Sequence, residues 1–195
     1  MAYKMSYFKQ QILVIFTSSP GSGKTYFSRQ ATERLGAVRL TSDSMRRAIF
    51  GSTNEHERIK EVLGRPTVLS YVFNAMDYSA EQVVSAGHDL IYESNNNKRD
   101  QRRHAQELAN KCGAAVIVVH LEVPYDVAMK RIQEREDASD SRPFDEQGAR
   151  ELLDRIQSNT DPFDNDELVV NLDGQLPFDE QFAEFERQVK ELIDK

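Results

Sequence analysis

The sequence has little of what several common protein classes require. Its 195 residues include one cysteine, Cys112, so neither an intramolecular disulfide nor a cysteine-based metal site can form. No stretch is apolar for long enough to span a membrane, and the first residues lack the apolar core and small-residue cleavage site of a signal peptide. By elimination, the sequence predicts a cytoplasmic protein.

An excess of positive charge is absent as well. The chain has 25 Lys and Arg against 32 Asp and Glu, which gives a formal net charge of −7. This balance disfavours nonspecific binding to nucleic acid, although a local basic patch could still exist. The histidines show no shared spacing typical of a metal site, and no internal repeat or linker divides the chain. We therefore expect a single domain over residues 1–195.

What the sequence does contain is a phosphate-loop pattern at residues 18–25, Ser-Ser-Pro-Gly-Ser-Gly-Lys-Thr. The pattern follows the apolar run Ile12–Phe16 and precedes apolar residues at helical spacing, namely Phe27, Ala31 and Leu35. A buried strand, a glycine loop, a Lys-Thr pair and a helix in this order are the context that a P-loop requires. The alternative is a glycine-rich turn that binds nothing, and this context makes it the weaker interpretation.

Each residue type in this loop has a physical role in holding a nucleotide. Gly21 and Gly23 let the backbone turn tightly and present N–H groups to phosphate oxygens, and the helix N-terminus adds its dipole. Lys24 supplies a charge for the outer phosphates, and Thr25 offers a hydroxyl to Mg²⁺. Ser18 stands where the formula has glycine, which is tolerable if its φ is negative. The residues expected to bind ATP are Pro20, Gly21, Ser22, Gly23, Lys24, Thr25 and Tyr26.

The remaining hydrophobic pattern alternates between strands and helices. Apolar and β-branched runs predict strands at residues 11–17, 38–41, 89–93, 114–121 and 168–172. Helical periods predict helices at residues 23–35, 55–63, 67–86, 98–111, 145–157 and 178–193, with others starting near 42 and 124. This alternation predicts an α/β fold, a P-loop NTPase three-layer sandwich around a five-stranded parallel sheet. Ligands in such sheets bind at the carboxyl ends of the strands, so residues just past them are site candidates.

Asp43 lies just past the second predicted strand, on the same sheet edge as the P-loop. A carboxylate there could accept the proton of an attacking hydroxyl. It could equally serve as the N-cap of the following helix, for which Ser42 is the other candidate, and the two roles of Asp43 are compatible. Arg46 lies one turn further along the same helical side. It could hold an anionic group on the acceptor or form a simple ion pair with Asp43.

Glu93 ends the third predicted strand. A carboxylate at the end of a buried strand beside a P-loop can hold Mg²⁺ through water, and we favour this over an acid exposed at the strand end. Asn95 follows it and is a further candidate for contact with the acceptor. The basic residues that come next indicate either a basic wall or a helix with a solvated face: Lys98, Arg99, Arg102 and Arg103.

A group of arginines marks the region of residues 131–142. Arg131 and Arg135 lie one turn apart on the same helical face, and Arg142 follows where the helical period breaks, at residues 137–144. A basic lid that closes over transferring phosphates would use such residues to neutralise developing charge. Neighbouring acids could instead pair with them, but the break in periodicity makes us favour a lid at residues 137–144.

With these positions in place, the chain resembles the small P-loop kinases grouped around polynucleotide 5′-kinase, zeta toxin and chloramphenicol phosphotransferase. The matching stretches are Ser19–Thr25, Leu40–Arg46, Gly87–Asn95, and Val118–Leu121 leading through Ala128–Arg131 to Arg135. The resemblance covers about residues 11–172. It implies an ATP-dependent phosphotransferase in which Lys24 and Thr25 bind ATP·Mg²⁺.

The resemblance also implies roles for the candidates outside the P-loop. Asp43 corresponds to a general base, and Arg46 to a residue that orients the acceptor. Arg131 or Arg135 would act from the lid. Glu93 stands where many relatives carry aspartate, which leaves open whether it holds Mg²⁺ or touches the acceptor.

Three functions remain open from the sequence. The first is a kinase that moves the γ-phosphoryl of ATP to a hydroxyl of a small-molecule or nucleotide-like acceptor. The second is a nucleotide-binding regulatory ATPase or switch, which has no need of a base at Asp43. The third is a nucleic-acid 5′-end kinase, against which the net charge counts. The sequence does not identify the acceptor, whose pocket we expect residues 51–66 to shape.

Overall fold

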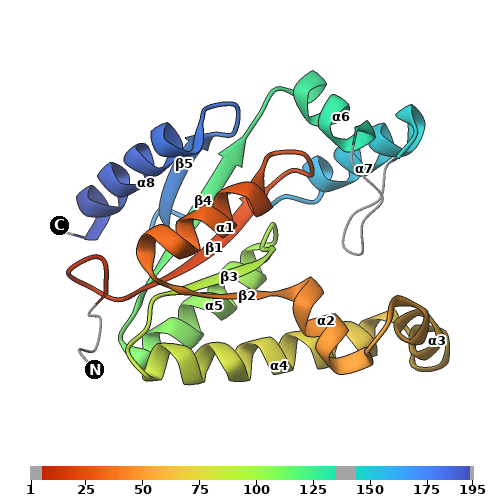
Figure 1. Ribbon diagram of the computed structural model, residues 1–195, viewed down its shortest axis with the longest axis horizontal. Coiled ribbons are helices and arrows are strands. Elements are labelled where there is room, and N and C mark those ends of the chain that lie inside the picture. The colour runs from red at the N-terminus through yellow and green to blue at the C-terminus, as the bar shows by residue number, and fades with distance from the viewer. Residues whose placement is uncertain (1–5, 135–143, 194–195) are drawn as a thin grey trace.

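A computed structural model of the chain describes residues 6–134 and 144–193 and has a five-stranded parallel sheet at its centre (Figure 1). The strands lie in the order β2-β3-β1-β4-β5. Their bounds are β1 Ile12–Ser18, β2 Val38–Thr41, β3 Leu90–Asn95, β4 Ala115–Glu122 and β5 Leu168–Asp173. The helices are α1 Lys24–Leu35, α2 Ser42–Phe50, α3 Thr53–Leu63, α4 Arg65–Ser85, α5 Arg99–Cys112, α6 Tyr125–Gln133, α7 Glu146–Ser158 and α8 Phe178–Ile193. The predicted α/β fold with a five-stranded parallel sheet is confirmed.

The central strand β1 shows why the sheet is covered on both faces. All seven of its residues are buried, as the unbroken apolar run predicts. Ile12, Val14 and Phe16 belong to a core shared with α1 and α8. Leu13 and Ile15, which alternate with them, belong to a second core shared with α4 and α5. The sheet is therefore the middle of three layers.

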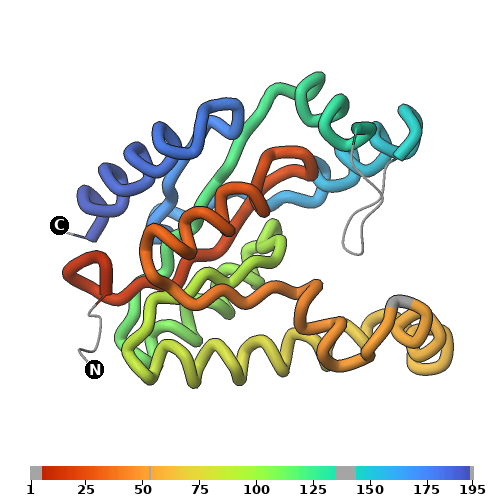
Figure 2. Tube along the Cα trace, viewed as in Figure 1, coloured from red at the N-terminus to blue at the C-terminus, as the bar shows by residue number. Residues whose placement is uncertain are grey.

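Two helix pairs stand at the end of the molecule away from the chain termini, on opposite sides (Figure 2). The helices α2 and α3 follow β2, and residues 42–63 are called the α2–α3 arm below. The helices α6 and α7 follow β4 and share a small core that includes Ala128 and Ile132. Of the predicted lid, residues 137–143 lie outside the described residues.

The bounds of the predicted elements match the observed ones to within two residues. The third strand extends to Asn95, because its register with β1 shifts so that Asn95 pairs with Phe16. The cap of α2 is neither of the two candidates, Ser42 and Asp43. Thr41, not Asp43, is the N-cap, since its Oγ1 accepts the backbone N–H of Ser44 at 3.0 Å. Ser18 closes β1, and no described residue other than glycine has a positive φ.

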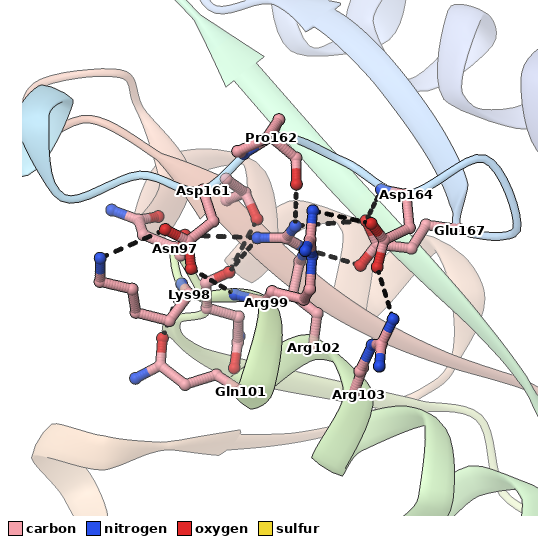
Figure 3. A network of polar contacts seen from close by, with 12 residues as sticks. Asn97, Lys98, Arg99, Gln101, Arg102, Arg103, Asp161, Pro162, Asp164 and Glu167 are labelled. Carbon is pink, nitrogen blue, oxygen red and sulfur yellow. Dashed lines mark hydrogen bonds and ion pairs between the residues drawn. The ribbon is translucent and has the colours of Figure 1, made fainter.

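The basic residues at the start of α5 pair with the segment that leads into β5 (Figure 3). The side chains of Lys98, Arg99 and Arg103 remain 46%, 42% and 65% exposed, so the alternative of a solvated face holds for these three. Arg102 is only 2% exposed. Its guanidinium donates to Glu167 at 2.7 Å and to the carbonyl oxygen of Pro162 at 2.7 Å, and lies 5.0 Å from the ring centre of Phe163. The neighbouring pairs are Lys98–Asp161, Arg99–Asp164 and Arg103–Asp164. This network fixes the approach to β5.

Candidate active site

The P-loop joins β1 to α1 through two glycines with left-handed backbone conformations. The φ of Gly21 is +82° and that of Gly23 is +99°, values that glycine adopts at little cost. The position of Gly21 also has no room for a side chain, because a Cβ there would lie 2.7 Å from the carbonyl oxygen of Ala128 on α6. The N–H of Ser22 donates to the carbonyl of Ser19 at 3.2 Å and closes the turn. The loop is thus shaped by its glycines and packed against α6.

A third glycine, which sequence reasoning missed, holds the P-loop from the side of β5. Gly174 follows β5 directly, and its N–H donates to the carbonyl of Glu122 at 2.7 Å. A Cβ at this position would collide with the carbonyl oxygen of Ser22 and would lie 2.8 Å from Cγ1 of Val123. The available sequence signal was a glycine just past a predicted strand end, at the edge where ligands bind.

Arg131 of α6 faces the backbone of the same loop. Its Nη1 donates to the carbonyl oxygens of Gly21 at 3.2 Å, Ser22 at 3.5 Å and Gly174 at 3.0 Å. A charged donor that reaches both loops ties them together. Sequence reasoning placed this arginine over the phosphates; the geometry shows it holding the loop that would bind them. A direct role for Arg131 in catalysis stays a prediction.

Glu93 is the centre of a buried polar cluster at the end of β3. Its Oε1 accepts from Thr25 Oγ1 at 2.8 Å, and its Oε2 accepts from Ser28 Oγ at 2.6 Å and from Arg39 Nε at 2.7 Å. The residue is 6% exposed, so the alternative of a solvent-exposed strand-end acid is wrong. The cluster brings together both residues that were predicted to serve Mg²⁺, Thr25 and Glu93.

The surroundings of Glu93 keep it ionised despite its burial. Burial raises the pKa of the Glu93 carboxyl, but other interactions outweigh it. These are the hydrogen bond from Ser28, the positive charge of Lys24, the hydrogen bond from Thr25 and the charge of Arg39. Together they lower the pKa of Glu93 below its ordinary value. A buried carboxylate next to the P-loop lysine is therefore a fixed negative charge.

Lys24 and Asn95 complete the group of side chains at this edge. The Nζ of Lys24 donates to Oδ1 of Asn95 at 3.1 Å, which places the amide at the end of β3 beside the lysine that begins α1. The structure thus gathers a lysine, a hydroxyl, a carboxylate and an amide from β1–α1 and β3. Such a group can hold phosphates and a hard cation, and it offers polar partners to a second substrate.

Arg39 was not singled out from the sequence, although it lies in the middle of the short strand β2. It donates to Oε2 of Glu93 and, at 3.1 Å, to Oγ of Ser28. A charged residue inside an apolar strand was the signal that could have indicated it. Its partner, however, comes from a neighbouring strand, so the pairing depends on the fold.

Asp43 and Arg46 lie at the start of α2 and pair with each other, with Nη1 of Arg46 2.5 Å from Oδ1 of Asp43. The side chain of Asp43 is 44% exposed. Thr41, two residues before it, is level with Glu93 in the register of β2 and β3. Asp43 therefore lies at the sheet edge that carries the P-loop cluster. The predicted ion pair exists, and the carboxylate remains accessible to solvent.

Two predicted site residues are not brought into this group. Tyr26 follows Thr25 on α1 with its side chain 55% exposed. Arg135, proposed to act from the lid, lies outside the described residues. Their roles stay predictions.

The described residues contain no group of three or more His, Cys, Asp or Glu side chains that could hold a metal ion. A cation at Thr25 and Glu93 would therefore need further ligands from phosphates or water, which is how Mg²⁺ is commonly held beside nucleotides. No helix of the described part of the chain is long and apolar enough to cross a membrane.

Comparison with known sequences reveals relatives along most of the chain. A family model described as an AAA domain matches residues 13–162. Adenylate kinase isoenzyme 1 of Cyprinus carpio is 24% identical over 195 aligned residues, covering 94% of this chain and 97% of the relative. A UPF0200 protein of Saccharolobus islandicus is 26% identical, covering 98% of this chain and 97% of the relative.

Solved structures share the fold at lower identity. A sugar kinase from Janibacter sp. HTCC2649 superposes with a TM-score of 0.64 at 19% identity, covering 95% of both chains. A gluconokinase from Sinorhizobium meliloti 1021 superposes with a TM-score of 0.61 at 17% identity, covering 95% of this chain and 94% of the other. The fold is that of P-loop kinases.

Proposed function

The chain belongs to the AAA-domain family, and from this premise we propose that it transfers the γ-phosphoryl group of ATP to a hydroxyl of a small-molecule or nucleotide-like acceptor. The glycine turn with Lys24 and Thr25 supports nucleotide binding, because these groups match the residues that hold phosphates in P-loops. The names of three relatives point to the same class of reaction, since they are an adenylate kinase, a sugar kinase and a gluconokinase.

The observation that carries the proposal is the position of Asp43. The cap of α2 is Thr41, so the Asp43 carboxylate is not needed for that purpose. It lies two residues past the strand position level with Glu93, at the edge where the phosphates of ATP would lie. A carboxylate there can accept the proton of an attacking hydroxyl. A nucleotide switch has no use for such a base.

The neighbouring arginines would have three different roles in the reaction. Arg46, paired with Asp43, would orient the acceptor through an anionic or polar group. Arg131 holds the P-loop by its backbone carbonyls and so keeps the phosphate site in shape. Arg135 and the proposed lid at residues 137–144 would neutralise charge as the phosphoryl group moves. Catalysis would rest on positioning and charge neutralisation rather than on covalent chemistry.

Mg²⁺ is proposed to enter with ATP. The Thr25 hydroxyl and the Glu93 carboxylate are oxygen donors of the kind that Mg²⁺ prefers, and they lie within hydrogen-bond distance of each other. When bound, the ion would neutralise negative charge on the phosphates. Asn95, which accepts from Lys24, would contact the acceptor on the far side of the lysine. The nucleotide would lie over Pro20–Thr25, with Tyr26 beside it.

The narrower resemblance to polynucleotide kinase, zeta toxin and chloramphenicol phosphotransferase belongs to the proposal. Within that group, the net charge of −7 favours a small acceptor over a nucleic acid end. We also propose that residues 1–195 act as a single domain.

A screen of acceptors tests the proposed function. The purified chain would be given ATP and Mg²⁺ with sugars, nucleosides, amino alcohols or an oligonucleotide with a free 5′ hydroxyl, and ADP release would be followed. We expect one acceptor class to stimulate ADP release by the wild type, with no stimulation in Lys24→Ala, which reports contaminating activity. ATP hydrolysis that no acceptor changes would instead indicate a regulatory ATPase.

A further inference from the structure

A cavity of about 270 Å³ lies between α4 and α5, on the sheet face opposite to α1. Its floor is apolar and consists of Leu13 from β1, Phe73 from α4, and Ala105 and Leu108 from α5. Three of these four side chains are buried members of the second core, and Phe73 packs against it. The size is at the small end of ligand sites, which usually enclose about 300–1,000 Å³.

One wall of the cavity carries an aligned set of polar side chains. The Asp77 carboxylate accepts from the Tyr92 hydroxyl at 2.7 Å, and its other oxygen lies 2.8 Å from Nε2 of His104. Burial, the hydrogen bond to Asp77 and the charge of Asp77 raise the pKa of Tyr92, so the phenol stays a protonated donor. The two contacts fix the carboxylate in place, and its side chain is still 23% exposed.

The charge of the lining selects among ligands. Besides Asp77, the lining includes a second carboxylate, Asp100, and the amides of Asn95, Asn96 and Gln101. It includes no lysine and no arginine. The histidine of the lining, His104, already contacts Asp77. Carboxylates in a lining without lysine or arginine repel anions and attract cations, most strongly where an apolar floor excludes water.

We propose that this cavity binds a small organic amine with a compact apolar body. The body would lie on the floor of Leu13, Phe73 and Leu108, and the ammonium group would donate to the carboxylate of Asp77. Asn95 lines the cavity and also accepts from Lys24 of the P-loop, so the two sites share a wall. The claim concerns binding alone and does not depend on the proposed phosphoryl transfer.

Three probes with one apolar body and different head groups test the charge argument. Phenethylamine, 2-phenylethanol and 3-phenylpropionic acid would be titrated into the full chain by NMR, with binding read from the backbone and amide signals around Asn95 and Tyr92. We expect the amine to bind at least about tenfold more tightly than the alcohol, and the acid not to bind. None of the probes needs nucleotide, so failure of the kinase assay would not affect the result.

Matched variants place the binding in the cavity. Asp77→Asn keeps the shape and removes the charge, so amine affinity should fall about tenfold or more. Ala105→Leu keeps the carboxylate but fills the floor, so it should abolish binding of amine and alcohol alike. Glu107→Gln, which removes an exposed charge from α5 outside the lining, should change nothing. Thermal melts show whether each variant is folded. If Asp77→Asn does not fold, Ala105→Leu still tests the site.

Two results would overturn the proposal. One is equal affinity for the three probes, which would make the cavity an unselective apolar gap. The other is amine binding that survives in Ala105→Leu, which would place the amine elsewhere.

Discussion

The two sides of the candidate site are built differently, although both lie at the carboxyl edge of one sheet. On the P-loop side, Gly21 packs on α6, Gly174 packs on Ser22, and Arg131 bonds to three backbone carbonyls. On the α2–α3 arm, α2 buries only Phe50, and α3 buries none of the side chains whose burial is described. One side is interlocked, and the other is held by few core contacts.

The difference indicates which side of the candidate site is preorganised before a ligand binds. A loop locked by backbone contacts is preorganised for a ligand of constant shape such as a phosphate group. The arm instead presents exposed apolar side chains, with Val62 78% and Leu63 45% exposed, and surface ion pairs such as Arg58–Glu55. Such pairs contribute about 0–1 kcal/mol each, so they define little shape. The arm is therefore the less preorganised side of the candidate site, and we expect its shape to depend on the ligand that binds there.

Replacement of Asp43 by asparagine should have the largest effect, and this effect should be confined to the arm side of the candidate site. Loss of a general base typically lowers the rate about a hundredfold to ten-thousandfold, and we expect that reduction in acceptor phosphorylation. ATP affinity should stay near normal, and background ATP hydrolysis should fall less, because water need not occupy the acceptor site. Steady-state rates with the acceptor found in the screen measure both.

Thr41→Ala is the matched control, since Thr41 caps the helix that carries Asp43. Loss of a cap costs about 1 kcal/mol of stability and should leave most of the turnover. Full acceptor turnover in Asp43→Asn would show that Asp43 is not the base and would move the search to Glu93.

Lys24→Ala removes the positive charge that the P-loop side would offer to the phosphates of ATP. Its side chain contacts Asn95 at the sheet edge rather than the core, so the fold should survive. Removal of one preorganised charge typically costs about a hundredfold to a thousandfold in rate. Unlike Asp43→Asn, this variant should lose acceptor phosphorylation and background hydrolysis together. Unchanged nucleotide affinity and turnover, with an unchanged thermal melt, would refute the P-loop assignment.

Gly174→Ala tests the interlocking itself. The added methyl group would meet the Ser22 carbonyl, and overpacking of this kind costs about 1–3 kcal/mol. Because the strain falls on the P-loop, ATP affinity should decline along with the free energy of unfolding. Gly113→Ala is the control: its φ is +75° but nothing lies within 4 Å of a Cβ. It should lower stability by about 1–2 kcal/mol and leave ATP affinity unchanged.

The smallest expected effect is on the free energy of unfolding, measured as a function of pH for variants of two carboxylates. The pKa values of Glu93 and of Glu57 on α3 are both lowered, the first by buried partners and the second chiefly by its hydrogen bond with Lys60. A lowered pKa stabilises the fold above the unfolded value of about 4.3, and this stability is lost as the pH falls through the folded value. Glu93→Gln should therefore reduce the free energy of unfolding at neutral pH and differ less from wild type in acid.

The salt dependence separates the two carboxylates. Glu57 is half exposed, so added salt should remove most of the difference between Glu57→Gln and wild type. Glu93 is buried, and its contribution should persist. Urea unfolding at neutral and acid pH, in low and high salt, gives the free energy of unfolding of the wild type and of each variant under the four conditions. Equal salt sensitivity would mean that the Glu93 cluster is hydrated and not part of a locked site.

Local patterns predicted the elements well, because buried strands and amphipathic helices leave strong periodic signals. The P-loop was recognisable for the same reason, since its residues are contiguous. Gly174, Arg39 and the pairing of Arg102 with Glu167 were not, because their partners lie far away in the sequence. Thr41 is the cap for which sequence reasoning considered Ser42 and Asp43, a choice between neighbours that only the start of the helix decides. Contacts between distant segments are what one sequence does not reveal.

The central claim is that the γ-phosphoryl group of ATP reaches an acceptor hydroxyl. The most direct test is to follow a γ-labelled phosphate from ATP in the presence of the acceptor that stimulates ADP release. We expect the label to appear in a phosphate ester of the acceptor in an amount equal to the ADP formed above background hydrolysis, and we expect the label that Asp43→Asn releases to appear mainly as inorganic phosphate. Label released only as inorganic phosphate by the wild type, with every acceptor class, would contradict it.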